Sequence, residues 1–180
     1  MADRTNHGVA PQTHPDLLTW LTERAQSFEH WAEDTSTPET WDFSPQSLDT
    51  LEDLIHNQYS SNAESLTARR NAFLQGACWY IGEVVCRTRG AVWKFEPFAV
   101  KGAELPSLFG EADPSGVIDE PCVGAPEEGT EEAIYPMGAV HGLFSTEDEL
   151  GNPIAQRLSD VLGDFDEGED DEGEDEDDNE

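Results

Sequence analysis

The stretch that decides the fold is residues 61–97, SNAESLTARRNAFLQGACWYIGEVVCRTRGAVWKFEP. Apolar side chains recur through much of it at the 3.6-residue period of one helix face. Ser61, with Glu64 three residues later, fits a capping box, and Gly90 suits the left-handed residue that follows a last helical turn. The sequence therefore predicts one continuous central helix over residues 62–89.

Two further features predict that this helix packs on more than one side. Cys78, Gly82 and Cys86 form a stripe of small residues, which lets a second backbone approach closely. Trp79 and Tyr80 fall away from the main apolar face and are expected to cover a flank. We therefore expect this helix to form the core of the protein.

After the central helix the apolar period changes to two. Ala91, Trp93 and Phe95 fall on one face of a predicted half-buried strand, which ends at Pro97. Residues 98–101 are compatible with a second short strand before the next glycine. The pattern thus predicts a small sheet beside the central helix.

The chain before the central stretch predicts two more helices. Residues 1–13 are polar and carry no period, so they are expected to be disordered. Pro15 opens an apolar helical pattern over residues 15–33, and a Ser-Pro pair opens a second pattern over residues 45–59. Three helices are therefore expected before the strand.

The chain after the strand is rich in acids. Residues 110–133 combine acids, glycines and prolines, which predicts an exposed loop. The apolar segment 134–144 fits either a strand or a short helix, and a last helix is predicted over residues 153–162, closed by Gly163. Residues 164–180 are almost entirely acidic and predict a disordered tail, because they hold too little apolar area to offset the entropy of ordering.

Together these elements predict a single α+β domain over residues 14–163. We expect three N-terminal helices packed on a small β-sheet, with a short C-terminal helix. A chain of 180 residues is long enough for one domain with a sizeable core and too short for two large ones.

The charge of the chain is extreme and unevenly spread. The net charge is −31, whereas residues 68–102 hold six basic and two acidic residues. Phosphate binding needs a dominant positive field, so nucleic acid is not expected as a direct partner. The sequence contains no run of apolar residues long enough to span a bilayer and begins without a signal-peptide pattern, which favours a cytoplasmic protein with no membrane partner.

No set of residues predicts catalysis, a metal site or a cofactor. Cys78 and Cys86 are expected to behave as small apolar side chains, and the acids around Cys122 are expected to raise the pKa of its thiol. The histidines are scattered, with none four residues from another. His30 is interpreted as a solvated histidine near a helix end, and His141 as a packed or partly buried one.

Two predictions concern ion pairs. Glu83 precedes Arg87 by four residues, the favourable order for a pair on a helix surface. Arg69 and Arg70 are expected to pair with acids of the first two helices, or alternatively to anchor the acidic tail. Neither prediction by itself indicates a functional site.

The run WYIGEVV at residues 79–85, followed by Gly90 and Trp93, supplies a resemblance to known proteins. It is similar to a helix-then-strand pattern of uncharacterised actinobacterial proteins and of small immunity proteins from bacterial polymorphic toxin systems. The resemblance covers about 20 residues of the 180. It implies a small cytoplasmic α+β domain that neutralises a partner protein.

The charge layout favours a non-enzymatic, acidic protein-binding module, an inhibitor or immunity-type protein that neutralises a basic partner. The residues predicted to bind that partner lie in the tail: Asp164, Asp166, Glu167, Glu169, Asp170, Asp171 and Glu172. Two alternatives stay open. One is an acidic-tailed chaperone or scaffold in which the tail alone binds, and the other is an enzyme of unspecified reaction that uses His141 or Glu83 with a metal.

Overall fold

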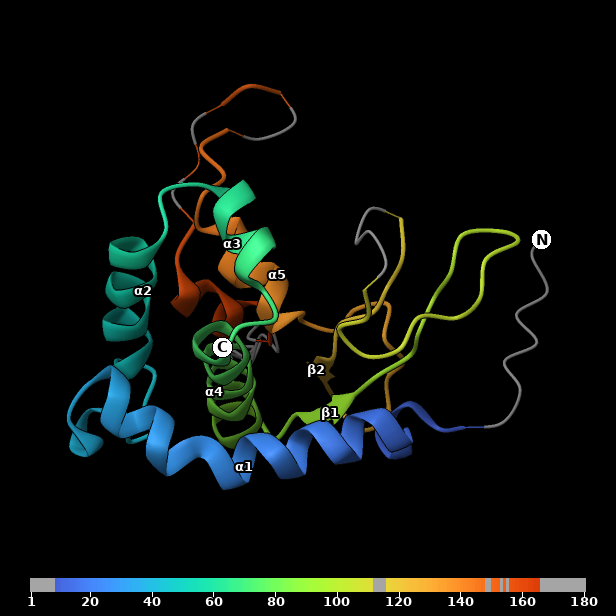
Figure 1. Ribbon diagram of the computed structural model, residues 1–180, viewed down its shortest axis with the longest axis horizontal. Coiled ribbons are helices and arrows are strands. Elements are labelled where there is room, and N and C mark those ends of the chain that lie inside the picture. The colour runs from blue at the N-terminus through green and yellow to red at the C-terminus, as the bar shows by residue number, and fades with distance from the viewer. Residues whose placement is uncertain (1–8, 112–115, 148–149, 153, 155, 166–180) are drawn as a thin grey trace, which may run out of the picture.

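The computed structural model describes residues 9–111, 116–147, 150–152, 154 and 156–165 (Figure 1). This part of the chain is mostly helical with one small antiparallel sheet, which confirms the broad α+β prediction. In chain order the elements are η1 (Pro11–Thr13), α1 (Pro15–Thr35), η2 (Pro38–Thr40), α2 (Ser47–Gln58), α3 (Asn62–Ala68), α4 (Ala72–Arg89), β1 (Val92–Lys94), β2 (Cys122–Gly124), α5 (Pro136–Gly142) and η3 (Leu158–Phe165), where η marks a 3-10 helix.

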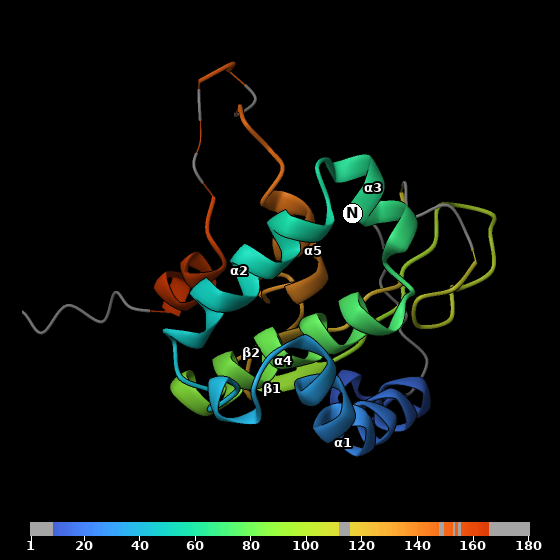
Figure 2. The same cartoon turned by 60° about the vertical axis from the view of Figure 1, so that its left-hand side comes forward.

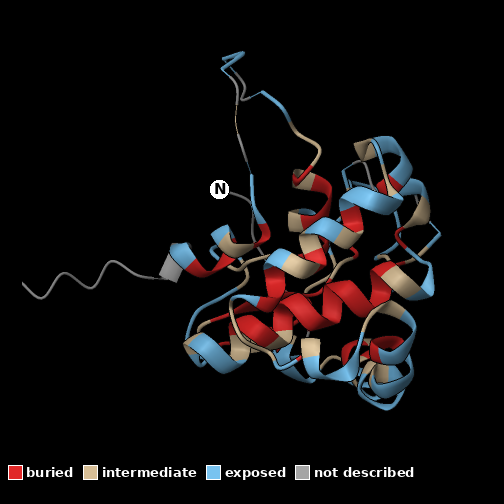
Figure 3. Ribbon diagram, turned by 90° about the vertical axis from the view of Figure 1, so that its left-hand side faces the viewer, coloured by how far each residue is buried: buried red, intermediate tan, exposed pale blue. Residues whose placement is uncertain are grey.

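Helix α4 occupies the centre of the molecule. In Figure 1 it is seen almost end-on, with α1 crossing below it, α2 to one side, and α3 and α5 above. Figure 3 shows that the middle of the helix is buried, and every residue from Leu74 to Gly82 is buried. A helix that is apolar all round belongs in a core. The prediction of a central core helix is confirmed.

The central helix is broken, although the sequence predicted it to be continuous. Helix α3 ends at Ala68 and α4 begins at Ala72, with Asn71 as its N-cap: the Asn71 Oδ1 accepts a hydrogen bond from the Leu74 N–H at 2.8 Å. An asparagine side chain satisfies one of the unpaired N–H groups of a first turn, so it favours a helix start at this position. The break also places Arg69 in the protein interior, where it is 4% exposed.

The predicted ends of this stretch are confirmed. The Ser61 Oγ accepts a hydrogen bond from the Glu64 N–H at 3.2 Å, while the Glu64 carboxylate accepts one from the Ser60 N–H at 2.7 Å. Gly90 has φ +69°, the left-handed conformation in which the absence of Cβ removes a steric cost. Strand β1 follows within the predicted segment.

Two glycines of α4 are covered by indole rings. A Cβ at Gly82 would overlap the ring of Trp93, and a Cβ at Gly76 would overlap the ring of Trp31. The prediction that the small stripe admits a second backbone is therefore wrong at Gly82, where a tryptophan side chain occupies that space. The indole N–H of Trp93 also has a hydrogen-bond partner, because its Nε1 donates to Glu83 Oε1 at 2.9 Å.

The aromatic flank of α4 is part of the core. Tyr80 is fully buried, and its hydroxyl lies 2.6 Å from the Ser47 Oγ and accepts a hydrogen bond from the Phe43 N–H at 2.9 Å. A buried tyrosine hydroxyl needs such partners, because an unpaired one costs free energy. These hydrogen bonds of Tyr80 connect α4 to the start of α2 and to the segment before α2.

The sheet consists of β1 and β2 in antiparallel register, with Trp93 opposite Val123. Strand β2 lies inside residues 110–133, which were predicted to form an exposed loop. That prediction is wrong for residues 121–124, which are buried. Their short apolar run pairs with β1, and Val123 also forms a bridge with Ile134 on its other side.

The structure corrects two predictions near the ends of the chain and decides one that was left open. Residues 11–13 form η1, where disorder was expected, and the Phe95 N–H donates to the Pro11 carbonyl at 2.9 Å. The apolar segment 134–144, left open between strand and helix, contains α5. The last helix, predicted over residues 153–162, begins only at Leu158, is a 3-10 helix and continues to residue 165, whereas residues 153 and 155 lie outside the described part.

Candidate functional site

The predicted partner-binding residues fall at or beyond the end of the described chain. Asp164 belongs to η3. The other six lie outside the described residues: Asp166, Glu167, Glu169, Asp170, Asp171 and Glu172. The tail thus stays a prediction, and the candidate site is built below from residues that the structure does place.

Most lysine and arginine side chains of the described chain are engaged in contacts within the fold. Arg69 contacts Asp119 and Glu120, Arg70 contacts Glu111, Arg87 contacts Glu83, Arg157 contacts Asp49 and Glu52, Arg89 donates to the Leu162 carbonyl, and Lys94 donates to the carbonyls of Ala125, Glu128 and Gly129. The predicted Glu83–Arg87 pair is confirmed at 3.4 Å. The predicted pairing of Arg69 and Arg70 with the first two helices is wrong, because their partners lie between residues 111 and 120.

Carboxylates outnumber these cations on the surface. Exposed acidic residues lie on several elements: Glu23, Glu29, Glu33 and Asp34 on α1, Asp49 and Asp53 on α2, Glu104 and Glu111 after β1, Glu127, Glu128, Glu131 and Glu132 after β2, and Asp160 on η3. Since most lysine and arginine side chains are engaged in contacts within the chain and acids outnumber them, the exterior carries a surplus of negative charge. Such a surface attracts cations and repels phosphates over several ångströms.

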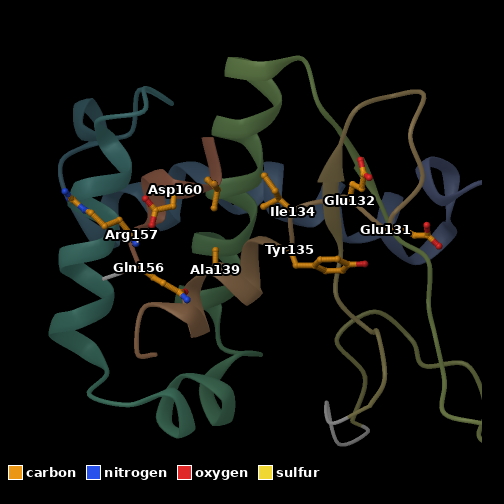
Figure 4. Close-up of a pocket in the computed structure, with 10 residues that line it drawn as sticks. Glu131, Glu132, Ile134, Tyr135, Ala139, Gln156, Arg157 and Asp160 are labelled. Atoms are coloured by element: carbon orange, nitrogen blue, oxygen red, sulfur yellow. Dashed lines mark hydrogen bonds between the residues drawn. The ribbon is translucent and has the colours of Figure 1, made fainter. Parts of the chain in front are cut away.

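One hollow of about 490 Å³ concentrates this charge. It lies between the segment before α5, α5 itself and η3, and Glu131, Glu132 and Asp160 are among its lining residues (Figure 4). Arg157 also lines it but points toward α2, where its guanidinium lies 2.9 Å from the Asp49 carboxylate. We call this feature the acidic hollow. Its η3 wall leads directly into the acidic tail.

A second polar cluster lies around the buried Arg69. Arg69 Nη1 donates to Asp119 Oδ1 at 3.0 Å and to Glu120 Oε1 at 3.1 Å. Asp119 is buried, whereas Glu120 is partly exposed. Burial raises the pKa of Glu120 above its usual range, and the nearby Arg69 opposes this rise. The pKa of Arg69 is raised in turn, first of all by its hydrogen bond to Asp119.

A hollow of about 320 Å³ opens beside this cluster. Its walls are apolar, formed by Leu66, Val117 and Ile118, and its polar lining residues are Asp119, Glu120 and Tyr135. Tyr135 also lines the acidic hollow, so the two hollows are neighbours. We call this second feature the arm hollow, because Ile118 belongs to the described residues of 97–120, which we call the arm.

His141 is packed in the interior, as predicted. Its Nδ1 lies 2.8 Å from the Ser65 Oγ, and the Ser65 hydroxyl also donates to the Asn62 carbonyl at 2.9 Å. The serine proton is thereby used, so His141 Nδ1 carries the hydrogen and Nε2 carries the lone pair. Burial, with a further contribution from Arg69, lowers the pKa of His141 to about 4. The ring is neutral at physiological pH.

The thiols do not favour nucleophilic chemistry. Burial raises the pKa of Cys86 to about 12 and that of Cys122 to about 11, and it raises the pKa of Cys78 well above its usual value. The predicted rise at Cys122 is confirmed, but its cause is burial more than neighbouring acids, since this residue is 1% exposed. Protonated thiols are poor nucleophiles.

No cluster of metal-ligating side chains was found within the described residues. His30 lies on the surface of α1, 3.3 Å from Asp34, in agreement with its interpretation as a solvated histidine. Among the helices that the structure describes, none combines the length and apolar character needed to cross a bilayer.

Comparisons with known proteins gave no match. No family model matches the sequence, and no significant similarity was found to a curated protein or to a solved structure. The resemblance to immunity proteins therefore stays a hypothesis.

Sequence reasoning missed Asp119, Glu120 and Tyr135. The two acids stand in a segment whose composition predicts exposure, and their cation lies 50 residues away in the chain. A signal was present in the apolar pairs that flank them, Val117-Ile118 and Cys122-Val123, because short apolar runs favour burial and a buried carboxylate needs a paired cation.

Proposed function

We propose that this chain is a non-enzymatic protein-binding module, an inhibitor or immunity-type protein whose acidic surface covers a basic partner protein. The observation that carries the proposal is the unequal use of charge. Arginine and lysine side chains are largely engaged in internal contacts, whereas many carboxylates remain on the exterior. A surface of this kind steers a basic partner and disfavours nucleic acid.

The acidic hollow is the proposed centre of contact. It is concave, three of its lining residues are acidic, and its arginine is already paired with α2. The tail that continues from η3 adds 12 acids over residues 166–180. Tail charges of this kind raise the association rate, while contacts at the hollow slow dissociation.

The test starts with capture of partners at low salt by two proteins, the full chain and a chain that ends at Gly163. A basic protein should bind to both, with a slower association for the shorter chain and an association rate that falls steeply with salt. Recovery of neutral or acidic proteins alone would contradict the proposal. Loss of all binding on truncation would instead favour a chaperone or scaffold that binds through its tail.

The hollow is tested with matched charge changes. The double variant Glu131→Gln/Glu132→Gln and the control Glu29→Gln/Glu33→Gln on α1 each remove two exposed charges. Both should slow association similarly, but the hollow variant should also raise the dissociation rate by about tenfold. Equal effects of the two variants on dissociation would place the contact elsewhere.

A further inference from the structure

Exposed apolar side chains gather on one projection of the molecule. This projection, the arm, comprises the described residues of 97–120 and extends away from the helices on the side of α3 (Figures 1 and 2). Four of the exposed large apolar side chains lie on it: Phe98 at 56%, Val100 at 48%, Leu105 at 68% and Ile118 at 37%. Single exposed apolar residues are ordinary, but a group of them marks an interaction surface.

The backbone of the arm places three of these side chains on one face. Phe98 and Ile118 form an antiparallel bridge with two hydrogen bonds, of 3.0 and 2.9 Å. Residues directly opposite in such a pair share a face, and Val100, two residues beyond Phe98, falls on the same face. Gly116 leaves room for Val100, whose Cγ1 lies 3.1 Å from the position of a Cβ at residue 116. These three side chains form an apolar strip.

The strip ends at the arm hollow. Ile118 belongs to both, and Leu66 from α3, itself partly exposed, forms another wall. On the polar side, both terminal nitrogens of Arg69 donate to Asp119. The Glu120 carboxylate accepts a hydrogen bond from Nη1, a nitrogen that also donates to Asp119. The hollow therefore carries a surplus negative charge between apolar walls.

We propose that the strip and the arm hollow together are the docking site for a basic amphipathic segment of the partner protein. Its apolar side chains lie on Phe98, Val100 and Ile118, and a lysine side chain enters the arm hollow with its ammonium at Glu120 and its aliphatic stem along Leu66. A lysine fits this geometry because its stem is apolar and its end is a compact charge.

This inference rests on the proposed function and adds an apolar contact beside the acidic hollow. Buried apolar contacts and desolvated charge pairs both slow dissociation, so the two hollows together hold the complex. Tyr135 lines both hollows, so the two are neighbours on the surface. One partner can therefore contact both.

The experiment uses the full chain and two synthetic peptides, each about four helical turns long. One peptide places leucine and lysine at helical spacing, and the other replaces every leucine by serine at the same charge. Affinity is measured by fluorescence anisotropy, and the contacts are located from amide chemical shifts. The Leu/Lys peptide should bind about tenfold or more tightly than the Ser/Lys peptide, with shifts centred on residues 66, 98–100 and 116–120.

Substitutions that keep the net charge isolate the strip. Phe98→Ser/Val100→Ser should bring the affinity for the Leu/Lys peptide down to that for the Ser/Lys peptide. The control Leu18→Ser removes a similarly exposed apolar side chain, 48% exposed, from α1 and should change neither affinity. Thermal melting checks that the variants fold, which is expected because the replaced side chains are exposed.

Glu120→Gln tests the lysine contact and should weaken binding of the Leu/Lys peptide by about tenfold, since hydrogen bonds to charged groups are stronger than neutral ones. Equal binding of both peptides, or an unchanged affinity of the double serine variant, would overturn the docking site but leave the proposed function intact. Failure of even the Ser/Lys peptide to bind at low salt would contradict the proposed function itself. The full chain could also form dimers that disappear in the double serine variant. That result would overturn the docking site, because a second copy of the chain would then cover the strip.

Discussion

Two regions beside α4, which we call the packed side and the charged side, are held to their neighbours by different kinds of contact. On the packed side, toward α1, indole rings lie over glycines, with Trp31 over Gly76, and Trp20 contacts Trp93 edge to face at 5.3 Å. The second region, the charged side, lies beyond the start of α4, where the buried Arg69 reaches the segment before β2. The packed side depends on close packing alone, whereas the charged side adds a buried ion pair to the apolar contacts around it.

This difference decides how each side responds to change. Packing of apolar and aromatic groups is insensitive to pH but fails when volume is added, because protein interiors are filled to the density of organic crystals. A buried ion pair fails when one partner is removed or when its protonation changes. Mutations and pH should therefore separate the two sides, beginning with the side held by charge.

The largest expected effect comes from removing the buried arginine. Arg69→Met keeps most of the aliphatic volume but leaves Asp119 buried, at 1% exposure, without its cation. We expect a loss of about 3–5 kcal/mol in the free energy of unfolding, measured by urea denaturation. Arg70→Met is the matched control: its side chain is 56% exposed and its pair with Glu111 spans 3.7 Å, so its loss should stay below about 1 kcal/mol.

A second substitution shows whether charge is the cause. Adding Asp119→Asn to Arg69→Met removes the unpaired carboxylate, so the double variant should recover part of the lost stability. A double variant that is less stable than Arg69→Met would mean that packing, and not charge, dominates at this position. The comparison between the two sides of α4 would then lose its basis.

The next effect is a pH dependence centred on His141, which joins α5 to α3. Its pKa is lowered to about 4 in the fold, from an ordinary value near 6.5. Between these values the unfolded chain binds a proton that the folded protein does not, so stability is present above pH 6.5 and is lost as the pH falls toward 4. The full loss is about 3 kcal/mol, from 1.36 kcal/mol for each pKa unit.

The measurement is urea unfolding of wild type and His141→Asn between pH 7.5 and 4. The variant cannot be protonated at this position, so the difference in its pH slope isolates the histidine from the many carboxylates that titrate in the same range. An unchanged slope in His141→Asn would contradict the assignment of His141 as a buried neutral histidine.

The packed side of α4 could be predicted from the sequence to a large extent. The apolar period, the left-handed glycine at position 90 and the alternation that begins at Ala91 are local features, and each reports on the backbone within a few residues. What the sequence did not indicate is the partner of Gly82. A glycine predicts a close approach, but whether a backbone or the Trp93 ring fills the space depends on the sheet.

The charged side could not be predicted in the same way. The partners of Arg69 lie about 50 residues further along the chain, and no periodicity connects them. Asn71 was overlooked as a cap because the apolar pattern continues across it, although an asparagine before an apolar run is a helix-start signal. Tyr135 lines both hollows only after α5 is placed, so the candidate site depends on contacts between distant segments.

The smallest of these effects tests the packed side. In Gly82→Ala the new methyl group meets the ring of Trp93, which is itself held by its hydrogen bond to Glu83. We expect a loss of about 1–3 kcal/mol in the free energy of unfolding, with no change in its pH dependence. Gly163→Ala is the control, because a Cβ there meets no atom within 4 Å. If Gly82→Ala were as stable as wild type, the ring would have room to move, and the packed side would be the more adaptable of the two. If the loss instead grew at low pH, the two sides would be energetically coupled, and their contributions to stability would not be additive.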